Sequence, residues 1–236
     1  MQMERVLSSW SGGKDSSLAL YEVLGEGKYE VVALLTTLSD TYRRISHHGV
    51  REELLDEQAR SLGLPLEKMF LPESPSNTVY EAQMRDVLTR YKARGVGAVV
   101  FGDIFLEDLR RWREEKLALI DMKGIFPLWG ENTAALVRRF INLGFKAKLV
   151  CIDPDKLEVD LAGCEVDDEM LARLPSDVDP CGENGEYHSF VYDGPIFSFC
   201  VRHELAQVEQ HGRNIFREVL PAANPAGLAP SAVVKP

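Results

Sequence analysis

The sequence has no long hydrophobic stretch. No apolar run in its 236 residues approaches the ~18 residues of a membrane span, and the first residues lack the apolar core of a signal peptide. We therefore expect neither a transmembrane helix nor export, which favours a cytoplasmic protein.

Cysteine is scarce. The four cysteines are Cys151, Cys164, Cys181 and Cys200, and no two of them form a C-x-x-C pair. This spacing argues against a zinc site or a dithiol centre. We expect reduced thiols, as is usual in the cytoplasm.

Basic residues are outnumbered, since 27 Lys and Arg face 37 Asp and Glu and the net charge is −10 at pH 7. A protein that wraps a long nucleic acid usually has a basic domain, so this balance argues against such a partner. A small anionic ligand stays compatible because it needs only a local positive pocket. The 45% of hydrophobic residues suffice for the core of a soluble globular protein.

Short β-rich runs alternate with helical patterns over the first two-thirds of the chain. The runs ERVLSSW and YEVVALLTTL predict two strands, and PLEKMFLP, VGAVVFGD and FKAKLVCID predict three more. The second run lacks polar alternation, as expected where both faces of a sheet are covered. The order predicts an α/β fold with a doubly wound, Rossmann-like sheet of five parallel strands, with ligands beyond their carboxyl ends.

The pattern changes after about residue 153, where one short helix is followed by strand and turn signals. We expect a larger domain over residues 1–153 and a smaller α+β domain over residues 154–220, with a loop-rich extension of the first domain as the alternative. Residues 221–236 are rich in Pro and Ala, and we expect a disordered tail there.

A glycine-rich segment, SGGKDS, lies between the first predicted strand and the helix that follows it. Gly12 and Gly13 permit close approach of the backbone, and the N–H groups of a helix N-terminus attract anions. Lys14 offers a positive charge to a phosphate oxygen. Asp15 suits a Mg²⁺ ligand or a cap of the helix. The segment therefore predicts a phosphate site.

The Walker A loop is the obvious alternative, and it does not fit. Its pattern G-x-x-x-x-G-K-[ST] requires Ser or Thr after the lysine, where this chain has Asp15. The segment instead resembles the S-G-G-x-D-S loop of the ATP pyrophosphatases, in which Ser11 and Ser16 supply hydroxyl donors. This resemblance implies the adenine nucleotide alpha hydrolase fold, ATP binding, and attack of a substrate on the α phosphorus with loss of pyrophosphate.

Gly102 and Asp103 end the fourth predicted strand, at the ligand-bearing edge. Asp103 is a candidate for a second Mg²⁺ ligand or for orienting the ribose or the substrate, and an N-cap of the next helix is the alternative. Arg110 and Glu114 share a face of that helix. Arg110 is a candidate for substrate binding, and an exposed ion pair with Glu114 is the alternative.

Three further features are weaker. His47 and His48 precede a predicted helix, and His48 is a candidate for contact with phosphate or substrate against an ordinary surface role. Trp129 in FPLWG is expected to pack between domains rather than to stack on a ligand. A metal site at Cys181 and His188 would need further ligands that we do not find in the sequence.

The most unusual part of the C-terminal region is GENGEYHS, residues 182–189. Asn-Gly predicts a tight turn, here between two carboxylates and followed by imidazole and hydroxyl groups. These groups could bind a polar substrate or ammonia, and a solvated turn is the alternative. The candidates are Glu183 and Glu186 for catalysis and Asn184, Gly185, His188 and Ser189 for substrate binding.

With the SGGKDS, GDI, PLW and GENGEYHSFVYDGP motifs in this order, the chain resembles the diphthine–ammonia ligase family of ATP pyrophosphatases from about residue 4 to about residue 200. The resemblance implies a substrate cleft between two domains, ATP and Mg²⁺ as cofactors, and amidation of an adenylated carboxylate by ammonia. It implies ATP binding by residues 11–16 and Gly102, and Mg²⁺ binding by Asp15 and Asp103. The catalytic set that it implies is Lys14, Asp15, Asp103, Glu183 and Glu186.

The last motif departs from the pattern E-G-G-E-[YF]-E-[TS] of the diphthamide enzymes, because Asn184 and His188 replace a glycine and a glutamate. The variant is similar to a sister branch whose acceptor is expected to be another carboxylate, such as a corrinoid acid. The acceptor therefore stays open between diphthine on a translation factor and a small molecule.

Three hypotheses follow. The first is a ligase that uses ATP, free ammonia and a carboxylate. The second is an RNA-modifying ATP pyrophosphatase, against which the acidic charge and the absence of paired cysteines count. The third is a non-catalytic nucleotide sensor, against which the complete set of Lys14, Asp15 and Asp103 counts. The sequence leaves a homo-oligomer open.

Overall fold

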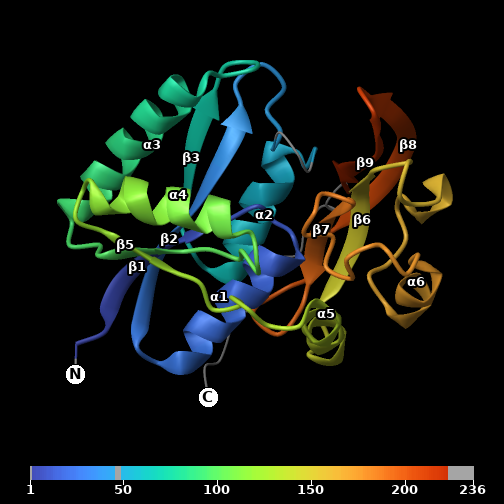
Figure 1. Cartoon of the computed structure of the whole chain (residues 1–236), viewed down its shortest axis with the longest axis horizontal. Coiled ribbons are helices and arrows are strands. Elements are labelled where there is room, and N and C mark those ends of the chain that lie inside the picture. Colours follow the sequence, from blue (N-terminus) through green and yellow to red (C-terminus); the bar gives the residue numbers. More distant parts are fainter. Residues whose placement is uncertain (1, 46–48, 223–236) are drawn as a thin grey trace, which may run out of the picture.

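A computed structural model describes residues 2–45 and 49–222 and contains two β-sheets (Figure 1). The first has the order β3-β2-β1-β4-β5, and all neighbouring strands in it are parallel. Its strands are β1 (Glu4–Ser9), β2 (Tyr29–Ser39), β3 (Leu66–Leu71), β4 (Ala98–Val100) and β5 (Lys123–Ile125). The prediction of a five-stranded parallel sheet is confirmed.

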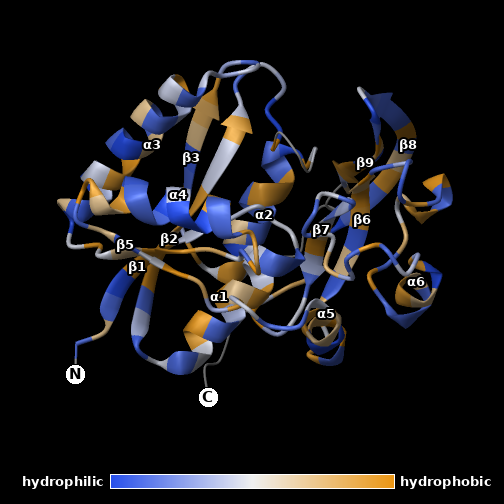
Figure 2. Cartoon of the chain, viewed as in Figure 1, coloured by the Kyte–Doolittle hydropathy of each residue, from blue (hydrophilic) through white to orange (hydrophobic). Residues whose placement is uncertain are grey.

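Helices cover both faces of this sheet. Successive residues of a strand point to opposite sides, and in the buried strands the residues on both sides are apolar. Val6 packs with α1 and α2 on one face, and Leu7 packs with α3 and α4 on the other. The helices are α1 (Lys14–Glu26), α2 (Glu52–Leu62), α3 (Asn77–Lys92), α4 (Glu107–Ala118), α5 (Thr133–Asn142) and α6 (Asp168–Arg173). In Figure 2 the outer helix α4 is mainly hydrophilic, as a solvent-facing element should be.

The second sheet is antiparallel and has the order β7-β6-β9-β8. Its strands are β6 (Lys146–Ile152), β7 (Tyr187–Asp193), β8 (His203–His211) and β9 (Asn214–Pro221). The segment FKAKLVCID, predicted as the fifth parallel strand, forms β6 in this sheet, so that assignment was wrong. The short β5 takes the fifth position, and its three residues carry too little pattern to be seen in the sequence.

The two sheets share one hydrophobic core, which runs from Val6 and Leu34 of the parallel sheet to Phe190 and Val219 of the antiparallel one. The division of the chain at residue 153 stays a prediction, and most of the proposed tail, residues 223–236, lies outside the described residues. No helix in the described ranges combines the length and the apolar character that a membrane span requires.

Candidate active site

The glycine-rich loop joins β1 to α1, and a glycine stands at the start of the helix. Gly12 has φ +73°, a conformation that favours glycine, and Gly13 is the N-cap of α1 without a side-chain cap. The hydroxyls of Ser11 and Ser16 lie 3.1 Å apart beside this end, and Ser11 Oγ accepts from Gly13 N–H at 3.3 Å. The helix dipole and the hydroxyls at this end favour an anion here.

Lys14 is buried, with 4% of its surface exposed, and its ammonium is fully engaged within the chain. Nζ lies 2.9 and 2.8 Å from the two carboxylate oxygens of Asp15, donates to the carbonyl of Cys181, and lies 5.1 Å from the centre of the Tyr187 ring. Burial lowers the pKa of Lys14, but the Asp15 carboxylate outweighs this effect and the net pKa is raised. The lysine is therefore a fixed positive charge.

Gly102 and Asp103 follow β4 at the same edge of the sheet. A Cβ at Gly102 would lie 2.8 Å from the carbonyl carbon and oxygen of Asp15, so glycine is required for β4 to approach α1. Asp103 pairs with Arg113 of α4 at 2.7 Å, and burial raises its pKa against the influence of that arginine. Leu106 is the N-cap of α4, so the alternative role of Asp103 as a helix cap is wrong.

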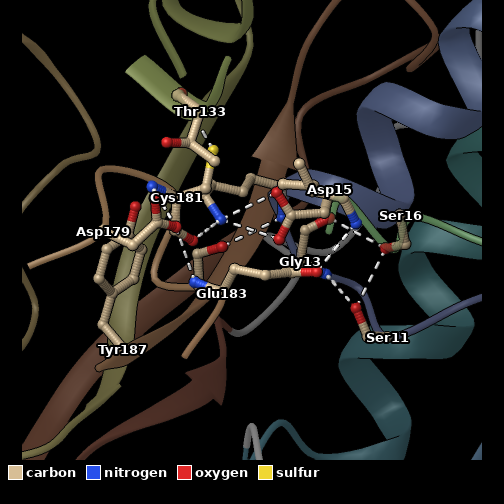
Figure 3. A network of polar contacts seen from close by, with 12 residues as sticks. Ser11, Gly13, Asp15, Ser16, Thr133, Asp179, Cys181, Glu183 and Tyr187 are labelled. Atoms are coloured by element: carbon tan, nitrogen blue, oxygen red, sulfur yellow. Dashed lines mark hydrogen bonds and ion pairs between the residues drawn. The ribbon is translucent and has the colours of Figure 1, made fainter. Parts of the chain in front are cut away.

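Glu183 reaches this edge from the turn before β7 (Figure 3). Its Oε1 accepts a hydrogen bond from the N–H of Ile104 at 2.9 Å, next to Asp103. Burial raises the pKa of Glu183 to about 7; the Ile104 N–H opposes the shift and the Asp15 carboxylate adds to it. A carboxyl group with this pKa can exchange a proton near neutral pH.

Glu186, by contrast, is buried inside its own turn. It accepts hydrogen bonds from Asp179 N–H at 3.1 Å, from Asn184 N–H at 3.0 Å and from the Asn184 side-chain amide at 3.1 Å. Asn184 thus uses its amide to hold the turn, and Gly185 has φ +88° within it. Glu183 is presented by a turn that Glu186 stabilises.

Strand β7 brings Ser189 against the loop, where Ser189 Oγ accepts from the Lys14 N–H at 3.1 Å. His188, its neighbour, points to the opposite side of the strand by alternation and pairs in register with Cys151 of β6. The structure therefore brings Ser189 into the site and directs His188 away from it.

Arg110 of α4 lies in an aromatic cluster. Its guanidinium carbon is 4.7 Å from the Phe126 ring centre and 4.5 Å from that of Trp129, and its Nε lies 2.9 Å from a Glu114 oxygen. The ion pair with Glu114 thus exists. The predicted contact of His48 falls outside the described residues.

Sequence reasoning missed three residues that shape the site. Asp179 Oδ2 accepts from the N–H groups of Cys181 and Glu183 at 3.2 and 3.0 Å and so folds the turn. Arg113 pairs with Asp103, and Gln58 of α2 contacts the loop. The Asp-Pro pair at 179–180 is a turn signal, whereas the other two carry no local signal.

Among the described residues, no three His, Cys, Asp or Glu side chains form a metal site. Burial raises the pKa of Cys181 to about 12, so the thiol stays protonated and is a poor metal ligand. Asp15 and Asp103 offer carboxylate oxygens, and Mg²⁺ in nucleotide sites takes one or two such groups together with phosphates. The donor chemistry therefore fits Mg²⁺ with a nucleotide rather than a metal held by the protein alone.

A cavity of about 550 Å³ lies between the ends of β2 and β3 and the antiparallel sheet. Its walls include Ser39, Tyr42, Phe216 and the buried carboxylate of Glu218. Arg44 and Arg51 hold Glu218 at 2.7 and 2.6 Å. The residues that line it do not include those of the glycine-rich loop.

Curated relatives include the diphthine–ammonia ligase of Danio rerio, which is 28% identical over 238 residues that cover 91% of this chain and 92% of that protein. The diphthine–ammonia ligase of Mus musculus is 25% identical over 243 residues, covering 91% of this chain and 88% of that protein. A solved structure, the U34-tRNA thiolase NcsA from Methanococcus maripaludis, has a TM-score of 0.35 and 19% identity over 60% of this chain and 57% of that one. A likeness of that extent supports no conclusion about this chain.

Two family models match the chain. The diphthamide synthase N-terminal domain matches residues 4–123, which hold the glycine-rich loop and Asp103. The diphthamide synthase C-terminal domain matches residues 132–219, which hold Glu183 and Ser189. Because the two models together span most of the sequence in this order, the chain belongs to the diphthamide synthase family.

Proposed function

We propose that this protein is an ATP-dependent ligase that adenylates a carboxylate and then amidates it with ammonia. The observation that carries the proposal is the meeting of Lys14, Asp103 and Glu183 around the N-terminus of α1. The kinship with diphthine–ammonia ligases supports the same reaction type.

In this proposal, the first turn of α1 and the hydroxyls of Ser11 and Ser16 bind the β and γ phosphates. Lys14 moves its Nζ from Asp15 to a phosphate oxygen. The transfer is short because Asp15 lies in the same helix turn that would bind the phosphates. A buried cation in this position stabilises the negative charge that accumulates on the departing pyrophosphate.

Asp15 and Asp103 are the residues that we propose for Mg²⁺. The ion would neutralise charge on the phosphates when it is bound. Both carboxylates have a cation beside them in the free chain, Lys14 and Arg113, whose place Mg²⁺ would take.

The proposed reaction has two steps, and each forms one bond and breaks another. A carboxylate oxygen of the acceptor forms a bond to the α phosphorus while the bond from that phosphorus to the β-phosphate oxygen breaks. The nitrogen of ammonia then bonds to the acyl carbon, the bond to the AMP oxygen breaks, and a proton leaves the nitrogen. We assign that proton to Glu183, because its pKa of about 7 allows it to accept one near neutral pH.

The test is to incubate the protein with Mg²⁺-ATP, ammonium and a panel of acids that includes diphthine-type and corrinoid carboxylates. We expect AMP, pyrophosphate and an amide, and we expect Asp15→Asn to abolish all three. Formation of ADP would contradict attack on the α phosphorus. ATP binding without turnover across the panel would favour the sensor hypothesis, and AMP formation that requires tRNA would favour the RNA-modifying one.

A further inference from the structure

The side chain of Gln58 connects three parts of the molecule that are far apart in the sequence. It projects from α2 and is fully buried. Its Oε1 accepts from the Trp10 indole N–H at 3.0 Å, and its Nε2 donates to the carbonyls of Gly12 at 3.0 Å and of Val191 at 2.5 Å. One amide thus joins the end of β1, the glycine-rich loop and β7.

The carbonyl of Gly12 is held from two sides. It accepts from Gln58 and also from the N–H of Val191, at 2.9 Å. A Cβ at position 12 would lie 2.7 Å from Gln58 Oε1, so glycine lets the loop lie directly on this amide. The carbonyl is therefore fixed toward α2 and β7.

The orientation of this carbonyl decides the direction of the next N–H. In a trans peptide the C=O of one residue and the N–H of the next point in opposite directions. With the Gly12 carbonyl held inward, the Gly13 N–H points toward the hydroxyl of Ser11, the side on which we expect phosphate. A flipped peptide would place a carbonyl oxygen there, and that oxygen would repel an anion.

We propose that Gln58 is a positioning residue that holds the Gly12–Gly13 peptide in its anion-binding orientation. The part of this inference that concerns ATP binding rests on the proposed function. Only a primary amide of this length offers one acceptor to Trp10 and two donors to the carbonyls. An apolar side chain would remove one of the two donors that hold the Gly12 carbonyl and leave the Val191 N–H to hold it, so the Gly12–Gly13 peptide would be restrained less firmly.

The test compares Gln58→Met, which keeps the length and removes both the donors and the acceptor of the amide, with Ser61→Ala as the matched control. Ser61 lies one turn later on α2, is equally buried, and also binds the C-terminal part, through Phe199 N–H at 3.0 Å. Its described bonds are to Ser198 and Phe199, not to the glycine-rich loop. Both variants lose hydrogen bonds between α2 and the C-terminal segment, but only Gln58→Met also loses a hydrogen bond to the glycine-rich loop.

Two measurements are made on the full-length protein. Amide hydrogen exchange over residues 10–17 reports on the loop without any nucleotide, and the dissociation constant of Mg²⁺-ATP reports on binding. For Gln58→Met we expect roughly tenfold faster exchange in the loop and a roughly tenfold higher dissociation constant, the effect of losing the one hydrogen bond of ordinary strength that Gln58 makes to the Gly12 carbonyl. For Ser61→Ala we expect both values to stay within about twofold of wild type.

Unchanged loop exchange in Gln58→Met, or an equal change in Ser61→Ala, would overturn the inference. If wild type does not bind ATP, the proposed function fails while the exchange data still decide the role of Gln58. A second variant, Gln58→Glu, keeps the shape and retains one donor only when it is protonated. Its loop exchange should therefore rise with pH relative to wild type, and a pH-independent ratio would contradict the role of the donors.

Discussion

At the scale of single residues, the charges of the candidate site are paired with one another before any ligand arrives. Lys14 is bound by Asp15, and Asp103 is bound by Arg113. Buried charges without partners are costly, so the free protein has to provide these pairs. In the proposed function, ligand binding is an exchange of partners in which a phosphate replaces Asp15 as the partner of Lys14.

The elevated pKa of Glu183 predicts how stability and activity depend on pH. Its pKa is about 7 in the folded protein against 4.5 ordinarily, so the folded state keeps a proton that the unfolded state has lost between these values. Stability should therefore fall as pH rises from about 4.5 to about 7. Glu183→Gln removes this cost, and we expect its melting temperature to exceed that of wild type at pH 8 and to match it at pH 4.

The same variant should lose the pH dependence of amidation. With the concentration of free ammonia held constant, the wild-type rate should rise up to about pH 7 and then level off, whereas the rate of Glu183→Gln should stay low and flat. A wild-type profile without this step, or a variant that retains it, would contradict the role of Glu183 as a base.

Gly102 offers a steric test of how closely β4 approaches α1. In Gly102→Ala the new Cβ would lie 2.8 Å from backbone atoms of Asp15, which cannot move aside as a side-chain tip can. We expect a loss of about 1–3 kcal/mol in the free energy of unfolding by urea, together with weaker ATP binding.

Gly97→Ala is the matched control, because Gly97 lies just before the same strand and its Cβ would meet only the flexible Glu4 carboxylate, at 3.2 Å. We expect a change of less than about 0.5 kcal/mol and unchanged ATP binding. Equal effects of the two substitutions would show that the contact with Asp15 has no special importance.

The sequence predicts which residue types gather at the loop but not which side chains contact one another. SGGKDS and its position between a strand and a helix are local signals, so Lys14 and Asp15 can be found without a structure. The contacts of Gln58 and Arg113 depend on packing between helices and loops that are distant in the chain. Glu186 was expected to face the substrate, yet its partners lie within its own turn.

At the scale of secondary-structure elements, local patterns are again predictable from the sequence and long-range pairing is not. The buried, β-rich runs of β1, β2 and β3 are long enough to be recognised, and their parallel arrangement follows from the helices between them. The apolar run of β6 predicts a strand but not its partners. It pairs with β7 and β9, which are distant in sequence, and this is why it was assigned to the wrong sheet.

Strand β9 is tied to the segment before α2 by the buried carboxylate of Glu218. Burial raises its pKa, but Arg44 and Arg51 outweigh burial and the net pKa is lowered. The stability that this carboxylate contributes is present above its ordinary pKa and is lost as pH falls through the lowered value. We expect Glu218→Gln to cost about 2–3 kcal/mol at pH 7 in urea unfolding, less than for a fully buried triad because both arginines are about one-third exposed.

Glu209→Gln on β8 is the control, because this partly exposed carboxylate lines the same cavity and its described partners, Gln207 and His211, are exposed side chains. Its loss should cost less than about 0.5 kcal/mol. If Glu218→Gln proved as mild as the control, the ion pairs with the two arginines would not contribute to the attachment of β9.

At the scale of the whole molecule, the shared core predicts that the described part of the chain unfolds as one unit. The core cluster includes residues of both sheets, so neither sheet can open without exposing apolar surface of the other. We expect tryptophan fluorescence, from Trp10, Trp112 and Trp129, and far-UV circular dichroism to give superimposable urea transitions. Two separate transitions would show that the sheets unfold independently.

The hydrogen bonds between the segments matched by the two family models also have a consequence for how the protein can evolve. Lys14 and Gly12 belong to the first segment, and they bind Cys181, Ser189 and Val191 of the second. At Cys181 and Val191 the bond is made by the main chain, so it depends on the path of the backbone rather than on the type of side chain. We therefore expect a recombination that exchanges one segment between relatives to preserve the glycine-rich loop only where the backbone of the new segment follows the same path, even if every motif residue is present.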